Sequence, residues 1–182
     1  MAEPAPLAIE VVESGSLTRA LSSEILHLCT VVFDEDLTEL FEVASPTTHV
    51  LGRVDGQLAS HAMWCTRWLQ PGPRAPVRTA YVEAVGTLPD FQRRGYASRL
   101  MRRLVGEIPA PCELAALCPA TSEIYERLGW RFWRGSLSVR MPDDTELPTP
   151  EERVMIYDLA GRPVVDVDEP LSVEWRPGEE VW

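Results

Sequence analysis

The segment from Val82 to Leu100 constrains this chain most, because it reads as an apolar strand, a glycine-containing loop and the start of a helix. Such an arrangement points several backbone N–H groups at one small volume, where the helix dipole also favours negative charge. Gly95 stands at the tightest point of the loop, and Arg93, Arg94 and Arg99 add positive charge. The segment therefore predicts a site for a phosphate or pyrophosphate group.

The chain contains no lysine, and all 17 of its basic residues are arginine. This composition excludes sites that need an ammonium side chain, such as a P-loop, a pyridoxal-phosphate Schiff base or a kinase phosphate lysine. Any phosphate must therefore be held by backbone amides and arginine.

The net charge of −11 disfavours nucleic acid as a partner, because nucleic-acid binding depends on neutralising phosphates. An acidic cleft concentrates cationic ligands, so the charge favours a cationic small molecule as substrate. The alternative is that the acidic surface only keeps the protein in solution.

The length of 182 residues and the apolar content of 45% predict one globular domain over residues 1–182. No run of 18 apolar residues is present, so no membrane association is expected. The N-terminus lacks a basic region followed by an apolar stretch, so the expected location is cytoplasmic.

The four cysteines show no C-x-x-C spacing, and we expect no metal site. His27, His49 and His61 are scattered and are expected to be packing or surface residues.

Apolar spacing and turn signals predict an α/β fold with a mostly antiparallel sheet of about seven strands. Strands 78–88 and 113–117 form its central parallel pair, joined through a helix. Ser16 is the expected N-cap of the first helix, Asp55-Gly56 the turn of a hairpin, and 142–150 a loop. The expected strands are 7–13, 48–54, 57–69, 78–88, 113–117, 130–139 and 153–159, and the expected helices are 17–33, 36–43, 96–108 and 121–128.

The run Gln92-Arg93-Arg94-Gly95-Tyr96-Ala97 matches the Q/R-x-x-G-x-G/A acyl-CoA signature of the GCN5-related N-acetyltransferases, the GNAT superfamily. Further along, Ile124 to Trp130 resembles the later helix of that family, in which a tyrosine precedes a glycine-aromatic ending. The resemblance extends from residue 7 to about residue 160. It implies the GNAT fold and acetyl-CoA as the cofactor.

Within the superfamily the chain resembles the aminoglycoside 2′-N-acetyltransferases over residues 33–39, 80–85 and 175–182. Their ending, a Trp-Arg-x-Gly-acid-Val-Trp sequence, is similar to the one here, and a tail aligned to its last residue is specific because termini usually vary. The chain departs from the pattern at Cys118-Pro119, where the family has a serine-rich turn, and in the two glutamates of its tail. These departures leave the amine substrate and the acetylated position open.

The resemblance implies catalytic roles for Glu83 and Tyr125. Glu83 accepts the amine proton through water, and the Tyr125 phenol protonates the departing thiolate. A carboxylate in an otherwise apolar strand is costly unless it is paired or hydrated, which favours a functional Glu83. The alternatives are a structural ion pair for Glu83 and core packing for Tyr125.

By the same resemblance, the loop backbone holds the pyrophosphate, and main-chain amides of the preceding strand contact the acetyl and pantetheine groups. The alternative for the loop is an ordinary helix start at the surface. The residues implied in cofactor binding are Val85, Gly86, Thr87, Gln92, Arg93, Arg94, Gly95, Tyr96 and Ala97.

Carboxylates bind ammonium groups through charge-assisted hydrogen bonds, which makes acidic residues candidates for holding a polyamine sugar. The tail, residues 160–182, is expected to contribute to this site. Asp36 lies in the acidic run Asp34-Glu35-Asp36, for which a solvated loop is the alternative. The candidates for substrate binding are Asp36, Glu83, Ala84, Cys118, Glu152, Glu180 and the terminal Trp182.

The sequence thus predicts an acetyl-CoA-dependent N-acetyltransferase for an amine of a cationic small molecule, with an aminoglycoside antibiotic as the leading candidate. Acetylation would remove a positive charge from the drug and so confer resistance. The alternatives are a polyamine or a protein N-terminus as acceptor, or a non-catalytic acyl-CoA-binding module. A homodimer is the habit of the family.

Overall fold

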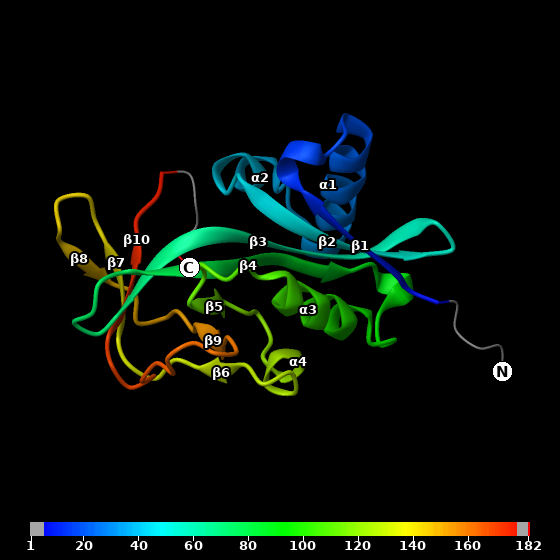
Figure 1. Ribbon diagram of the computed structural model, residues 1–182. Coiled ribbons are helices and arrows are strands. Elements are labelled where there is room, and N and C mark those ends of the chain that lie inside the picture. The colour runs from blue at the N-terminus through cyan, green and yellow to red at the C-terminus, as the bar shows by residue number, and fades with distance from the viewer. Residues whose placement is uncertain (1–5, 178–181) are drawn as a thin grey trace. The chain divides into compact units, whose positions relative to one another are not determined.

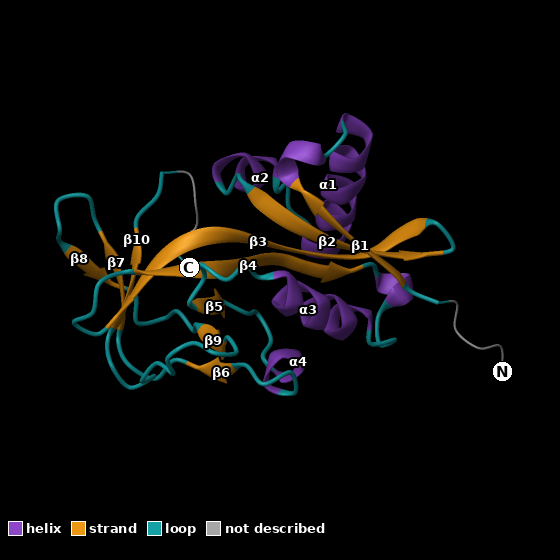
Figure 2. Ribbon diagram, in the orientation of Figure 1, coloured by secondary structure: helices purple, strands orange, loops and turns teal. Residues whose placement is uncertain are grey.

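The computed structural model describes residues 6–177 and residue 182, and Figures 1 and 2 show its helices and strands. Its elements, in chain order, are β1 (Ala8–Glu13), the 3-10 turn η1 (Ser14–Ser16), α1 (Arg19–Phe33), α2 (Thr38–Val43), β2 (Thr47–Val54), β3 (Gln57–Pro71), β4 (Val77–Thr87), the 3-10 turn η2 (Pro89–Phe91), α3 (Tyr96–Glu107), β5 (Leu114–Leu117), α4 (Glu123–Glu126), β6 (Arg131–Phe132), β7 (Leu137–Arg140), β8 (Glu146–Pro148), β9 (Met155–Asp158) and β10 (Leu171–Glu174).

Residue contacts group the described chain into two units. The first contains the residues up to Cys65 together with Val82–Glu107, and the second contains Thr66–Tyr81 together with the described residues from Ile108 onward. The long strands β3 and β4 each contribute one part to each unit. The two units are therefore described separately.

In the first unit, β1, β2 and β3 form an antiparallel sheet with helices on both faces (Figure 1). Ile25 and Leu28 of α1 pack with Leu51 of β2 in a buried cluster. The next residue of β2, Gly52, points the other way, since a Cβ built on it would lie 2.9 Å from the Leu100 side chain of α3. The alternation of a strand thus gives one face to α1 and the other to α3.

The predicted hairpin is confirmed, and it carries a bulge. Asp55 and Gly56 have φ values of 50° and 84°, the left-handed conformations that a two-residue turn of this kind needs. Val54 pairs with Gln57, but the register shifts between Gly52 and Arg53, so that β3 carries one additional residue there. A one-residue shift moves every later residue of a strand to the other face relative to its partner.

The N-cap prediction at Ser16 is wrong. Ser16 ends the turn η1, and α1 begins at Arg19 with Thr18 as its N-cap. The Thr18 hydroxyl accepts a hydrogen bond from the Leu21 N–H at 3.2 Å. Thr18 and Ser16 are both acceptable cap residues, so the choice depends on where the η1 turn places the chain.

In the second unit the strand order is β6-β9-β5-β4-β3-β10-β7-β8. The parallel pairing of β4 with β5, which aligns Thr79 with Leu114, confirms the predicted central pair. A second parallel pair, β10 with β7, was not predicted. The mixed α/β architecture with four helices is confirmed, and the described residues form ten strands because several short ones add to the expected seven.

Three boundary predictions in the second unit need correction. The expected strand 130–139 is divided into β6 and β7, because a Cβ on Gly135 would lie 1.8 Å from the Glu169 carbonyl oxygen and the chain turns there. The expected loop 142–150 contains β8, which pairs with β7 across a turn where Asp143 accepts hydrogen bonds from Thr145. The helix expected at 121–128 spans only Glu123–Glu126.

No helix in the described part of the chain is long and apolar enough to cross a membrane.

Candidate functional site

The connection from β4 to α3 has the backbone geometry that the sequence predicts for an anion site. Arg93 and Gly95 have positive φ values of 60° and 77°, and α3 begins at Tyr96. Arg99 N–H donates to the Gly95 carbonyl at 3.1 Å, which closes the first helical turn. The N–H groups that precede it in the first turn have no acceptor within the helix. Left-handed residues between right-handed ones turn successive N–H groups toward one point, a geometry that binds anions.

Side chains of the loop hold this geometry. The Gln92 amide donates to the Thr87 carbonyl at 3.1 Å, and the Arg94 guanidinium donates to the Asp90 carbonyl at 2.8 Å. Arg94 also lies over the Phe91 ring, 5.5 Å from its centroid. Two of the predicted phosphate-binding residues, Gln92 and Arg94, thus brace the loop on which the anion would lie.

Gly95 leaves space in front of these N–H groups. A Cβ built on it meets no other atom within 4 Å, so its positive φ, and not crowding by the protein, requires glycine there. The open side of the loop, the exposed Arg93 and the start of α3 together fit a pyrophosphate.

The end of β4 provides a second set of main-chain groups. Ala84 interrupts the strand with a φ of 50°, between the half-buried Glu83 and Val85. Gly86 is buried against α1, since a Cβ on it would lie 3.0 Å from the Val32 side chain. The Gly86 carbonyl accepts a hydrogen bond from the Ser60 hydroxyl at 2.8 Å. The backbone between Glu83 and Thr87 is therefore fixed by β3 and α1.

A chain of buried polar side chains leads to this strand. The Thr47 hydroxyl lies 2.8 Å from His49 Nε2, and His49 Nδ1 lies 3.0 Å from His61 Nε2. His61 Nδ1 in turn lies 2.9 Å from the Ala84 carbonyl oxygen. His49 and His61 were expected to be packing or surface residues, and both are buried. The hydrogen bonds between them were missed.

Burial keeps both imidazoles neutral. Burial lowers the pKa of His49 to about 4, and burial together with the neighbouring His49 lowers the pKa of His61 to about 3. Burial also raises the pKa of the Cys29 thiol, whose sulfur lies 3.9 Å from His61 Nδ1, to about 12. The side chains of His49, His61 and Cys29 are therefore uncharged at neutral pH.

Asp36 lies in the exposed connection before α2. Its Oδ1 accepts hydrogen bonds from the Thr38 N–H at 2.9 Å and from the Thr38 hydroxyl at 2.5 Å, and these lower the pKa of Asp36. The carboxylate thus holds the start of α2. Its role as a substrate contact stays a prediction.

In the second unit, Tyr125 of α4 is buried in an aromatic cluster. Its ring meets Trp130 edge-on with centroids 6.2 Å apart, and Trp130 lies 5.5 Å from the Tyr157 ring. The helix ends at Glu126, before the predicted stop at Gly129, and Gly129 lies in the turn that follows it, with a φ of 92°. Packing of Tyr125 is thus established, and its acid role stays a prediction.

Three of the predicted substrate contacts lie around one turn, residues 149–152. Cys118 Sγ donates to Glu152 Oε2 at 3.5 Å, and the buried Trp182 donates its indole N–H to the Thr149 hydroxyl at 2.7 Å. Glu152 N–H donates to the Thr149 carbonyl and closes the turn. The structure thus brings Cys118, Glu152 and Trp182 together, whereas Glu180 lies outside the described residues.

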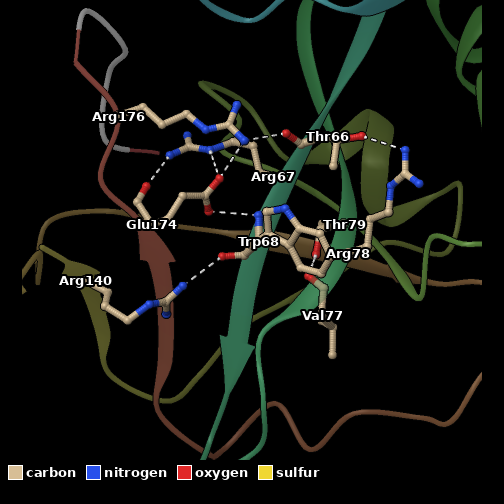
Figure 3. Close-up of polar contacts among 9 residues, drawn as sticks. All are labelled: Thr66, Arg67, Trp68, Val77, Arg78, Thr79, Arg140, Glu174 and Arg176. Atoms are coloured by element: carbon tan, nitrogen blue, oxygen red, sulfur yellow. Dashed lines mark hydrogen bonds and ion pairs between the residues drawn. The ribbon is translucent and has the colours of Figure 1, made fainter. Parts of the chain in front are cut away.

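An arginine network holds the segment that leads to Trp182 (Figure 3). Glu174 accepts a hydrogen bond from the Trp68 N–H at 2.8 Å and pairs with Arg176 at the same distance. Arg176 also donates to the Thr66 carbonyl at 2.7 Å, and the buried Arg67 donates to the Glu174 carbonyl at 3.0 Å. The tail is therefore tied to β3 as far as Arg176.

The predicted residues divide between the two units. The first unit holds Asp36, Glu83 to Thr87 and the loop 92–97, and the second holds Cys118, Tyr125, Glu152 and Trp182. Among the residues that the structure describes, no three His, Cys, Asp or Glu side chains are grouped as metal ligands.

Comparison with known proteins agrees with this geometry. A family model described as an acetyltransferase (GNAT) domain matches residues 17–133. An aminoglycoside 2′-N-acetyltransferase of Mycolicibacterium fortuitum is 29% identical over 133 residues, which cover 70% of this chain and 67% of that protein.

Two solved structures show the same fold. Eis1 from Mycobacterium abscessus superposes with a TM-score of 0.60 at 24% identity, over 73% of this chain and 33% of Eis1. The chain thus spans about a third of that relative. The GNAT family N-acetyltransferase YhbS of Escherichia coli, solved in complex with CoA, superposes with a TM-score of 0.64 at 13% identity, over 98% of this chain and 94% of YhbS.

The neutral histidines predict an acid-sensitive first unit. Below pH about 6.5 the unfolded chain protonates His49, whereas the folded chain does so only near pH 4, so stability falls as the pH drops through this window. The stability advantage of the wild type over His49→Gln should therefore narrow by up to about 1.4 kcal/mol per pH unit. Urea unfolding at pH 7, 6 and 5 measures it.

The matched control is His27→Gln, which removes an exposed imidazole of α1 and should leave the pH profile unchanged. The prediction is wrong if the difference in the free energy of unfolding between wild type and His49→Gln stays constant between pH 7 and 5. His49 would then take up its proton in the folded protein like an exposed histidine.

Proposed function

Because the chain belongs to the GNAT acetyltransferases, we propose that it transfers the acetyl group of acetyl-CoA to an amine of a cationic small molecule, with an aminoglycoside as the leading candidate. The observation that carries the proposal is the loop between β4 and α3. Its two left-handed residues and the start of α3 fit the pyrophosphate of the cofactor that this family uses.

Acetyl-CoA supplies an activated acetyl thioester when it is bound. Backbone N–H groups of residues 92–97 hold its pyrophosphate, and Arg93 adds positive charge. The main-chain amides of Val85 and Thr87 contact the acetyl and pantetheine groups, and Gly86 permits β4 to lie close against α1. The backbone of this chain therefore places the carbonyl carbon for attack by the amine.

Glu83 and Tyr125 carry the proton transfers of this proposal. Glu83, half-buried beside the kink at Ala84, accepts the proton of the substrate ammonium through a water molecule. The Tyr125 phenol donates a proton to the departing thiolate. Neither step needs a metal ligand.

The acceptor is proposed from charge and resemblance. A chain with a net charge of −11 attracts polycations, and Asp36, Glu152, Glu180 and the carboxylate of Trp182 supply anionic contacts for ammonium groups. The likeness to the M. fortuitum protein favours an aminoglycoside. Acetylation would then remove one positive charge from the drug, a chemical route to resistance.

Cys118 favours an acceptor different from that of the aminoglycoside 2′-N-acetyltransferases, which this chain resembles, or a narrower range of acceptors. Its thiol is engaged with Glu152, at the position where the resemblance places a substrate-contacting turn. A polyamine or a protein N-terminus is therefore the second candidate acceptor.

An amine panel tests the reaction. We expect CoA release from acetyl-CoA with aminoglycosides, and little with polyamines or peptides. Glu83→Gln should lower kcat by about 100-fold or more at pH 7, and the loss should shrink at higher pH, where the amine is already deprotonated. Glu10→Gln, which removes an exposed carboxylate of β1, is the control with unchanged turnover. Tight acetyl-CoA binding without turnover on any amine would leave only a binding module.

Gly95→Ala tests the loop. Alanine in the left-handed conformation is strained by about 1–2 kcal/mol, so relaxation of the loop should raise the Kd for acetyl-CoA by about tenfold. Gly106→Ala, a glycine of α3 with open space around it, is the control and should leave the Kd unchanged. Calorimetric titration gives both values. Equal affinities of the two variants would exclude the loop as the phosphate site.

A further inference from the structure

The kink of β4 at Ala84 needs support, because a non-glycine residue with a φ of 50° inside a strand is strained. The kink lies between Glu83 and Val85, the proposed proton acceptor and the proposed acetyl contact. Its carbonyl is turned toward the side chain of His61 on β3, 2.9 Å away. The His61 side chain thus holds the Ala84 carbonyl, and the positions of the two neighbouring residues, Glu83 and Val85, depend on it.

The Ala84 carbonyl determines which ring nitrogen of His61, and then of His49, carries the hydrogen. A carbonyl oxygen only accepts, so His61 Nδ1 carries a hydrogen, and because burial keeps the ring neutral, His61 Nε2 is an acceptor. His49 Nδ1 must then donate to it, and the hydroxyl of Thr47 must donate to His49 Nε2. Both imidazoles are therefore neutral Nδ1–H tautomers, and every hydrogen bond points toward Ala84.

Uncharged side chains pack against the pair. Phe41 lies against both rings, with centroids 5.5 Å from His49 and 5.9 Å from His61. The Cys29 thiol is the neighbour on α1. These hydrogen-bonded side chains do not form a proton relay, because the last acceptor is the carbonyl oxygen of Ala84.

The bulge in the hairpin brings the two histidines together. Leu51 pairs with His61, and His49 pairs with Met63, so both imidazoles lie on the same face of adjacent strands. Without the register shift, the two-residue turn at Asp55-Gly56 would place them on opposite faces. The additional residue of β3 is therefore a condition for the chain of hydrogen bonds.

We propose that Thr47, His49 and His61 form a buried positioning chain that fixes the Ala84 peptide and, through it, the side chain of Glu83 and the N–H of Val85 for acetyl transfer. This inference rests on the function proposed for β4. None of the three side chains is a catalytic residue, since each acts through the backbone of Ala84.

A matched pair of variants tests the proposal. His61→Asn places an amide N–H where Nδ1 stood and keeps a donor for the Ala84 carbonyl, whereas His61→Gln places its amide near Nε2 and loses that donor. We expect kcat within about threefold of wild type for His61→Asn and a loss of about 10- to 100-fold for His61→Gln. The KM for acetyl-CoA should change less than kcat, because the loop 92–97 supplies most of the cofactor contacts.

Leu58→Ala is the control for stability alone. Leu58 is buried in the cluster of Ile25, Leu28 and Leu51, and its apolar side chain makes no hydrogen bond to the histidines, so this variant should lower the Tm and keep kcat at 20 °C. Equal kcat values for the asparagine and glutamine variants, or a loss in Leu58→Ala as large as in His61→Gln, would overturn the positioning role.

Nitrogen-15 NMR of the full chain gives a readout that needs no substrate. At pH 7 both His49 and His61 should be neutral with the hydrogen on Nδ1, and the Val85 amide resonance should shift in His61→Gln and stay in place in His61→Asn. An Nε2–H tautomer at either residue, or the same Val85 shift in both variants, would contradict the proposal. These spectra distinguish its failure from that of the acetyltransferase function, which the amine panel alone decides.

Discussion

The site depends on backbone torsion angles that most residues avoid. Ala84, Arg93 and Gly95 have positive φ values within a short stretch that begins in β4 and ends at the first residue of α3. A left-handed non-glycine residue costs about 1–2 kcal/mol, so Ala84 and Arg93 must be held by their surroundings, whereas Gly95 adopts this conformation without that cost. His61 holds the first, and the bonds of Gln92 and Arg94 to nearby carbonyls hold the loop that contains the other two. This arrangement is the basis of the proposal that main-chain groups recognise a phosphate and a thioester.

Because the chain has no lysine, arginine is the basic residue that braces the fold and also the one that can add positive charge at the proposed phosphate site. Many of the guanidinium groups brace the fold by donating to main-chain carbonyls, as Arg99 does to Leu7 and Arg67 to Glu174. The planar group suits this work, because its donors lie in a fixed fork. Both arginines of the loop, Arg93 and Arg94, are exposed, and Arg94 donates in this way to the Asp90 carbonyl. In the proposed function, binding of the cofactor phosphates therefore falls mainly to backbone N–H groups.

Local patterns predicted the parts of the fold that local interactions decide. The Asp55-Gly56 turn, the strand before Gly95 and the helix after it all depend on glycine conformation or on short-range spacing. The bulge at Gly52/Arg53 shifts the register between β2 and β3, and no local pattern in the sequence marks it. The His49–His61 pair was missed for that reason, since a regular hairpin separates the two rings. The break at Gly135 likewise depends on a segment distant in sequence, the carbonyl of Glu169.

We propose that the loop between β4 and α3 holds the pyrophosphate of acetyl-CoA. The most direct measurement compares the affinity of the protein for acetyl-CoA with that for S-acetylpantetheine, which has the same thioester and lacks every phosphate. We expect acetyl-CoA to bind tighter by about 100-fold or more, equivalent to about 3 kcal/mol. Equal affinities for the two thioesters would contradict the account, because the loop would then contribute nothing to cofactor binding.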